Sequence, residues 1–153
     1  MYTPHLAEAN DIEEWAGTID ARSEFPNLIR RLILATADVK DIHVRAQEGT
    51  DYSGWDGRIK AEGGESHVPE GRSGWEMGTG QNPKSKAKKD YKKRTENPDP
   101  FDPSEDAFVF CTPRRWSGKE DWVDEKREEG DWRDVRVHDR DAGPGVIPAL
   151  GRR

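Results

Sequence analysis

Two short segments of the chain place a carboxylate directly after a tryptophan, with a glycine before it. They are Gly54-Trp55-Asp56 and Gly74-Trp75-Glu76. Two carboxylates that converge repel one another unless a cation neutralises them, and oxygen ligands suit Mg²⁺ or Mn²⁺. Such an ion can bind a phosphate oxygen, lower the pKa of a water and stabilise a leaving oxygen. We therefore interpret Asp56 and Glu76 as candidate metal ligands, although a single turn or edge-strand carboxylate is more often structural.

A dense run of basic residues follows the second of these segments. Between Lys84 and Arg94 the chain carries seven basic residues and one acid, Asp90. Like charges repel on an isolated helix, so the run indicates an anionic partner, and each neutralised phosphate would release counterions. The other interpretation, a solvated helix face with charge pairs, is weaker here. The predicted nucleic-acid contacts are Lys84, Lys88, Lys89, Lys92 and Arg94, together with Arg114 and Arg115, which could equally belong to a surface loop.

Length and composition are those of a single domain with a modest core. The chain has 153 residues, of which 31% are hydrophobic and 37% charged, and its net charge is -6. Six Trp and four Phe partly offset the low hydrophobic content, because each aromatic side chain buries a large area. The absence of a long apolar run, of a secretory pattern and of a second cysteine beside Cys111 predicts a soluble cytoplasmic protein without a membrane partner.

The N-terminal half predicts a helix followed by three strands. Apolar residues at helical spacing favour a helix over residues 11–36, in one bent piece or two, with Ser23 as an N-cap and Pro26 in the first turn of the second piece. Alternation predicts strands at 41–47, 55–61 and 74–78. In the second of these, Trp55, Gly57 and Ile59 are expected on one face and Asp56, Arg58 and Lys60 on the other.

The second half predicts helices over residues 83–95 and 118–129 and strands at 107–112 and 135–138, the first of them fully buried. Three neighbouring strands, a crossover helix and a further strand define an α/β fold with a mixed central sheet flanked by helices. We assign residues 1–141 to this domain. Residues 142–153, without periodicity, are expected to be a disordered or foreign tail.

The order of elements and the position of the acids resemble the PD-(D/E)XK, or restriction-endonuclease-like, fold with its αβββαβ core. The segments ARSEFPNLIRRLI, GWDG, VPEGRSGWEMGTG, KAKKDYKKRT and FVFCTPRRW are similar to N-terminal nuclease modules of large prokaryotic antiviral defence proteins. The resemblance covers residues 11–141. The resemblance implies a sensor or NTPase region as a further partner. Such modules normally continue with more helix, whereas here AGPGVIPALGRR follows Asp141, which suggests a truncated chain.

Carried over onto this sequence, the resemblance implies that Asp56 is the first metal-binding acid and Glu76 the acid of the (D/E)XK half-motif. The sequence departs from the motif two residues later, where Gly78 stands in place of lysine. In several lineages of this fold the lysine lies on the following helix, for which Lys86 and Lys93 are the candidates. A glutamate of the first helix, Glu14 or Glu13, is expected to complete the metal shell.

The leading hypothesis is a magnesium- or manganese-dependent endonuclease that hydrolyses DNA. In it Lys86 or Lys93 stabilises the phosphorane or orients the attacking water. The second hypothesis is a catalytically inactive nuclease-fold domain that binds nucleic acid or a protein partner, which the glycine at position 78 favours. A glycosidase with paired carboxylates would leave the lysine run without a role. DNA against RNA as target, and the oligomeric state, stay open at this point.

Overall fold

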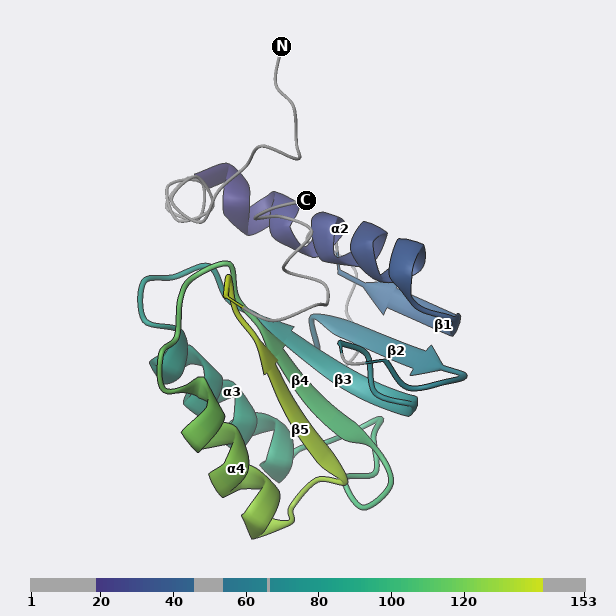
Figure 1. Cartoon of the computed structure of the whole chain (residues 1–153). Coiled ribbons are helices and arrows are strands. Elements are labelled where there is room, and N and C mark those ends of the chain that lie inside the picture. Colours follow the sequence, from purple (N-terminus) through teal and green to yellow (C-terminus); the bar gives the residue numbers. More distant parts are fainter. Residues whose placement is uncertain (1–18, 46–53, 66, 142–153) are drawn as a thin grey trace.

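The computed structural model describes residues 19–45, 54–65 and 67–141 of the chain. The elements in this part are α2 (Ile19–Thr36), β1 (Val39–Val44), β2 (Gly57–Ala61), β3 (Gly71–Met77), α3 (Pro83–Glu96), β4 (Ala107–Cys111), α4 (Lys119–Glu129) and β5 (Asp134–His138). They form three layers, with α2 on one face of a five-stranded sheet and α3 and α4 on the other (Figure 1).

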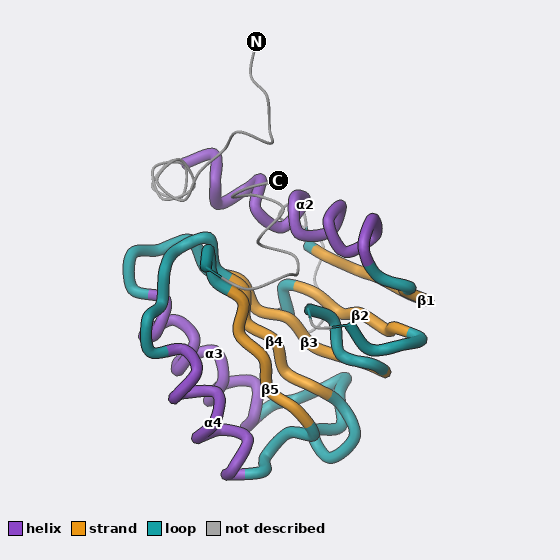
Figure 2. Tube along the Cα trace, in the orientation of Figure 1, coloured by secondary structure: helices purple, strands orange, loops and turns teal. Residues whose placement is uncertain are grey.

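The strands lie in the order β1-β2-β3-β4-β5. The first three form an antiparallel meander, whereas β3, β4 and β5 are parallel and are connected through α3 and α4 (Figure 2). This confirms the predicted α/β fold with a mixed sheet flanked by helices. The predicted residues 11–18 of the first helix and the predicted tail at 142–153 lie outside the described part.

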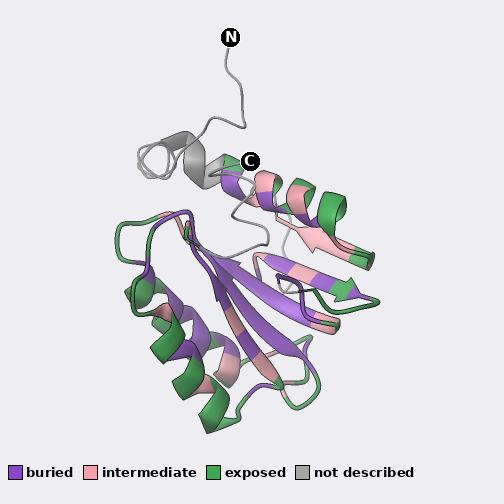
Figure 3. Cartoon of the chain, viewed as in Figure 1, coloured by how far each residue is buried: buried purple, intermediate pink, exposed green. Residues whose placement is uncertain are grey.

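Each face of the sheet has its own apolar core, because successive side chains of a strand point to opposite faces. In β4, Val109 and Cys111 pack toward α2, and Phe108 and Phe110 pack toward α3 and α4. All five residues of β4 are buried, as predicted, and the central strands are the most buried part of the sheet (Figure 3). None of the helices in the described ranges has the length and apolar character needed to cross a membrane.

Two details of the predicted elements are wrong. Ser23 does not cap a helix, because α2 runs without interruption from Ile19 through Ser23 and Pro26 to Thr36. A proline inside a helix removes one backbone hydrogen bond, so packing of Phe25, Ile29 and Ile33 against the sheet must offset that loss.

The second wrong detail is the position of Trp55, which does not lie on the same face of the sheet as Ile59. A bend at Asp56 separates Trp55 from β2, and its ring packs on the α3 side against Phe101 at 4.9 Å and Phe108 at 6.0 Å between centroids. Ile59 packs on the α2 side. Space for the indole comes from Gly74, where a Cβ atom would lie 2.6 Å from the ring.

We predict that Gly74→Ala destabilises the fold by about 1 to 3 kcal/mol, since the added methyl overlaps the Trp55 ring and cannot be accommodated by a small shift. The free energy of unfolding in urea measures this cost. Gly80→Ala is the matched control, because a Cβ at Gly80 would meet no atom within 4 Å. Equal stability of the two variants would contradict the packing described for Trp55.

Candidate active site

The structure brings the Asp56 and Glu76 carboxylates together on the α3 side of the sheet. Trp75 and Met77 pack toward α2, so Glu76 between them faces α3. Gly57 pairs with Trp75, which places Asp56, one residue before β2, next to the end of β3. There the Asp56 Oδ2 atom accepts a hydrogen bond of 2.8 Å from the backbone N–H of Met77. The two carboxylates are therefore neighbours across adjoining strands.

Arg94, near the C-terminal end of α3, is the principal partner of Glu76. Its Nε donates to Glu76 Oε2 at 2.8 Å, and both side chains are almost fully buried. The guanidinium also donates to the backbone carbonyl of Gly54 and lies 5.0 Å from the centroid of the Trp55 ring. The sequence analysis predicted Arg94 as a nucleic-acid contact, whereas its contacts place it inside the candidate site.

Lys86 lies over Gly78, two residues after Glu76. A Cβ at Gly78 would come within 2.9 Å of Lys86 Cγ and 3.6 Å of its Cε, so the lysine stem fills the space that a side chain at 78 would take. The negative charges of Asp90, Glu76 and Asp56 together raise the Lys86 pKa against the opposing effect of burial. Of the two candidate lysines, Lys86 is thus the one beside the carboxylates.

Asp90 is a member of the cluster that sequence reasoning did not single out. It is buried, and its carboxylate holds Lys86 Nζ at 2.8 Å and 3.1 Å. Lys86, Asp90 and Arg94 recur at i, i+4 and i+8, so they share one side of α3, which faces the sheet. The signal was present in the sequence, since Asp90 is the single acid in the lysine run.

Burial and charge oppose each other at Glu76. Burial, with a further contribution from the negative charge of Asp56, raises the Glu76 pKa to about 8, while Arg94 acts in the opposite direction. With Glu76 protonated, the carboxylates of Asp56 and Asp90 balance the cations Lys86 and Arg94. Loss of the Glu76 proton leaves one negative charge, which a cation next to Glu76 would neutralise.

The other candidates lie at the surface or outside the described residues. Lys93 is exposed, as are Lys84, Lys88, Lys89 and Lys92, and Lys92 pairs with Glu96 at 2.9 Å. The Arg114 side chain is buried and its Nε donates to the Thr79 carbonyl, so its position differs from the predicted surface contact. Arg115 is exposed and pairs with Asp141. The predicted ligand Glu14 and its alternative Glu13 lie outside the described part.

The carboxylates present fit only the simplest kind of magnesium site, in which the protein supplies one or two ligands. Within the described ranges no three or more His, Cys, Asp or Glu side chains are grouped so that they could hold a metal ion. Mg²⁺ is, however, commonly held by one or two carboxylates together with waters and substrate phosphates. Asp56 and Glu76 are the residues that would hold such an ion, and each already accepts a hydrogen bond, from the Met77 N–H and from Arg94 respectively.

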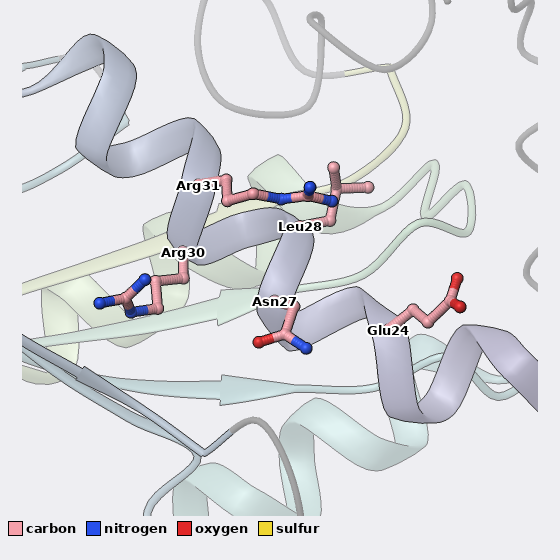
Figure 4. Close-up of a pocket in the computed structure, with 5 residues that line it drawn as sticks. All are labelled: Glu24, Asn27, Leu28, Arg30 and Arg31. Atoms are coloured by element: carbon pink, nitrogen blue, oxygen red, sulfur yellow. The ribbon is translucent and has the colours of Figure 1, made fainter.

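Two surface hollows lie away from this cluster. One runs along α2, where Leu28 and Arg31 point to one side and Arg30 to another (Figure 4). It lies on the α2 layer, across the sheet from Glu76. The other lies between α3 and α4 and is lined in part by Lys88, Tyr91 and Lys126. Neither contains a carboxylate of the candidate site.

Comparison of the chain with models of protein families, with curated protein sequences and with solved structures finds no significant match.

We predict that the free energy of unfolding falls as the pH rises from about 4.5 to about 8, the pKa values of Glu76 in the unfolded and in the native state. The native state holds the Glu76 proton up to about pH 8, while the unfolded chain releases it near 4.5, so native stabilisation is complete below 4.5 and is lost between these values. Between about pH 5 and pH 8 the loss is on the order of 3 kcal/mol, at roughly 1.4 kcal/mol per unit.

The measurement is urea unfolding of the parent and of Glu76→Gln at both pH values. The difference in pH dependence between the two proteins isolates the contribution of the Glu76 carboxyl. Identical slopes with pH would show that Glu76 ionises in the native state as it does in the unfolded chain.

Proposed function

We propose that the chain carries a metal-dependent nuclease site that hydrolyses phosphodiester bonds of DNA. The observation that supports this most is the position of Lys86, whose stem covers Gly78 and whose ammonium group lies in the field of Asp56 and Glu76. This supplies a lysine where the (D/E)XK half-motif requires one and the sequence itself has glycine. The helix, three-stranded meander, helix and strand from α2 to β4 are in the order of a restriction-endonuclease-like core, which is the finer fold that we propose.

Each residue of the cluster has a distinct part in this proposal. A divalent ion held by Asp56 and Glu76 would polarise a phosphoryl oxygen and activate a water. Lys86 presents its ammonium group to the negative charge that develops on the phosphate during attack. Asp90 holds that ammonium in place through its two contacts of 2.8 Å and 3.1 Å. Glu76 must lose its proton to bind a cation, so cation binding releases a proton and strengthens as pH rises toward 8.

The exposed lysines of α3 form the proposed nucleic-acid surface. Lys89 and Lys93 follow Lys86 at i+3 and i+7, so these three share the side of the helix that leads into the cluster. Lys88 and Lys92 line the hollow beside α4. Because contacts between cations and backbone phosphates carry no direct sequence information, we propose little sequence specificity. In the corresponding biological setting, the chain is the nuclease module of a defence system and works with a sensor or NTPase region.

A second candidate is a nuclease-fold domain that binds nucleic acid or a protein partner without cutting it. The observation in its favour is the Arg94 guanidinium, which holds Glu76 Oε2 at 2.8 Å. A buried contact of this kind is costly to break, so Arg94 could occupy the place of the metal in the resting structure. The two candidates differ in whether a divalent ion adds any activity.

We predict that the protein nicks plasmid DNA in the presence of Mg²⁺ or Mn²⁺, and that Asp56→Asn and Glu76→Gln abolish the activity. Lys86→Met should lower the rate at saturating DNA by about 100-fold, as expected for loss of a charge-stabilising donor. Lys93→Met should lose no more than a few-fold, through weaker binding. Lys40→Met, on β1, is the matched control for removal of an exposed cation.

Three outcomes separate the candidates. Equal cutting by the parent and the two carboxylate variants would contradict the site. A larger loss in Lys93→Met than in Lys86→Met would assign the catalytic lysine to Lys93. Salt-dependent DNA binding by the parent, with no metal-dependent cleavage of DNA or RNA, would favour the binding-only candidate.

A further inference from the structure

Arg94 connects the two segments that carry the candidate metal ligands. Through Nε it holds Glu76 of β3 at 2.8 Å, and through another guanidinium nitrogen it holds the carbonyl of Gly54, two residues before Asp56. The same group lies 5.0 Å from the centroid of Trp55, between those two residues. One buried side chain from α3 thus contacts the turn before β2 and the end of β3 together.

We propose that Arg94 is a positioning residue of the candidate site, which fixes the Gly54–Asp56 turn and the Glu76 carboxylate in one arrangement so that both acids face the same cation. The inference rests on the proposed function. It adds a role for a residue that the (D/E)XK pattern does not contain, and it assigns no contact between Arg94 and the substrate.

The chemistry of arginine suits this role better than that of lysine. A guanidinium offers several N–H donors in a rigid planar fork, so one group can hold a carboxylate and a carbonyl at once, whereas an ammonium is a compact point charge. Its flat face also stacks on an indole, which explains the contact with Trp55. Exchange of Arg94 for lysine would keep the charge but lose the fork.

The backbone at Gly54 is fitted to the guanidinium. Gly54 has φ of 82°, a conformation that L side chains rarely adopt, and a Cβ there would lie 3.2 Å from an Arg94 nitrogen. The turn can therefore approach Arg94 closely only with glycine at this position. A side chain at 54 would strain the turn and displace the guanidinium while leaving the charge of residue 94 unchanged.

The same contacts predict what removal of Arg94 would do. The turn that carries Asp56 would lose its tie to α3, and the Glu76 carboxylate would lose the group that holds it in place. Both ligands would then be less available to a cation.

The experiment measures Mn²⁺ binding by water proton relaxation, without a cleavage assay. In Arg94→Met the Mn²⁺ affinity should fall by about 10-fold or more at pH 7.5, in line with the effect of losing a group that orients a metal ligand. Arg94→Lys should restore little of the affinity, because lysine keeps the charge but lacks the planar fork. Lys40→Met, which removes an exposed cation of β1, should leave the affinity unchanged.

Gly54→Ala provides a second approach in case Arg94→Met does not fold. It should weaken Mn²⁺ binding with Arg94 still present. If a folded Arg94→Met or Gly54→Ala variant binds Mn²⁺ with parental or higher affinity, Arg94 is only structural and the inference is overturned. The readout is independent of cleavage, so a protein that binds Mn²⁺ but cuts no nucleic acid would refute the proposed function and still decide the role of Arg94.

Discussion

A glutamate buried between a sheet and a helix constrains much of this fold. Glu76 lies on β3 under α3, where an uncompensated carboxylate would be very costly. Arg94 contacts it at 2.8 Å, and Ala87 and Tyr91 are buried on the same side of α3, so these residues together set which side of the helix faces the sheet. Since Lys86 and Asp90 precede Arg94 by two turns and one turn, the same orientation brings both of them to the cluster.

The glycines around the cluster act mainly through the space they leave. Without a side chain at 74, the Trp55 ring can lie on β3, and without one at 78, the Lys86 stem can cover the end of the strand. The two Gly-Trp-acid segments therefore have different structural roles despite their similar sequences. Trp55 packs toward α3 and α4, while Trp75 packs toward α2. Only their acids end up on the same side of the sheet.

Local patterns in the sequence were sufficient for the architecture. Alternation in β2, the apolar run of β4 and the Asn82-Pro83 start of α3, where Asn82 caps the Ser85 N–H at 3.1 Å, are short-range signals. The meander followed from them, and with it the convergence of Asp56 and Glu76. The face of Trp55 did not, because a bend at Asp56 breaks the alternation that the prediction assumed.

The parts that could not be predicted depend on contacts between distant segments. Arg94 contacts Glu76 across 18 residues and Gly54 across 40, so the run of cations does not reveal which partners its last member has. Asp90 became part of the site only once the direction of α3 over β3 was known. Pro26 inside α2 is likewise tolerated through packing against the sheet and not through local propensity.

The central claim is that Asp56 and Glu76 together hold a divalent cation. Its most direct test is anomalous diffraction from a crystal of the protein soaked in Mn²⁺ at about pH 8. At that pH about half of the Glu76 carboxyls are ionised even without a cation. The account predicts an anomalous peak between the Asp56 and Glu76 carboxylates, with Lys86 beside it, and no such peak in Glu76→Gln. Mn²⁺ bound elsewhere, or Glu76 still paired with Arg94 and without an ion at saturating Mn²⁺, would contradict the account.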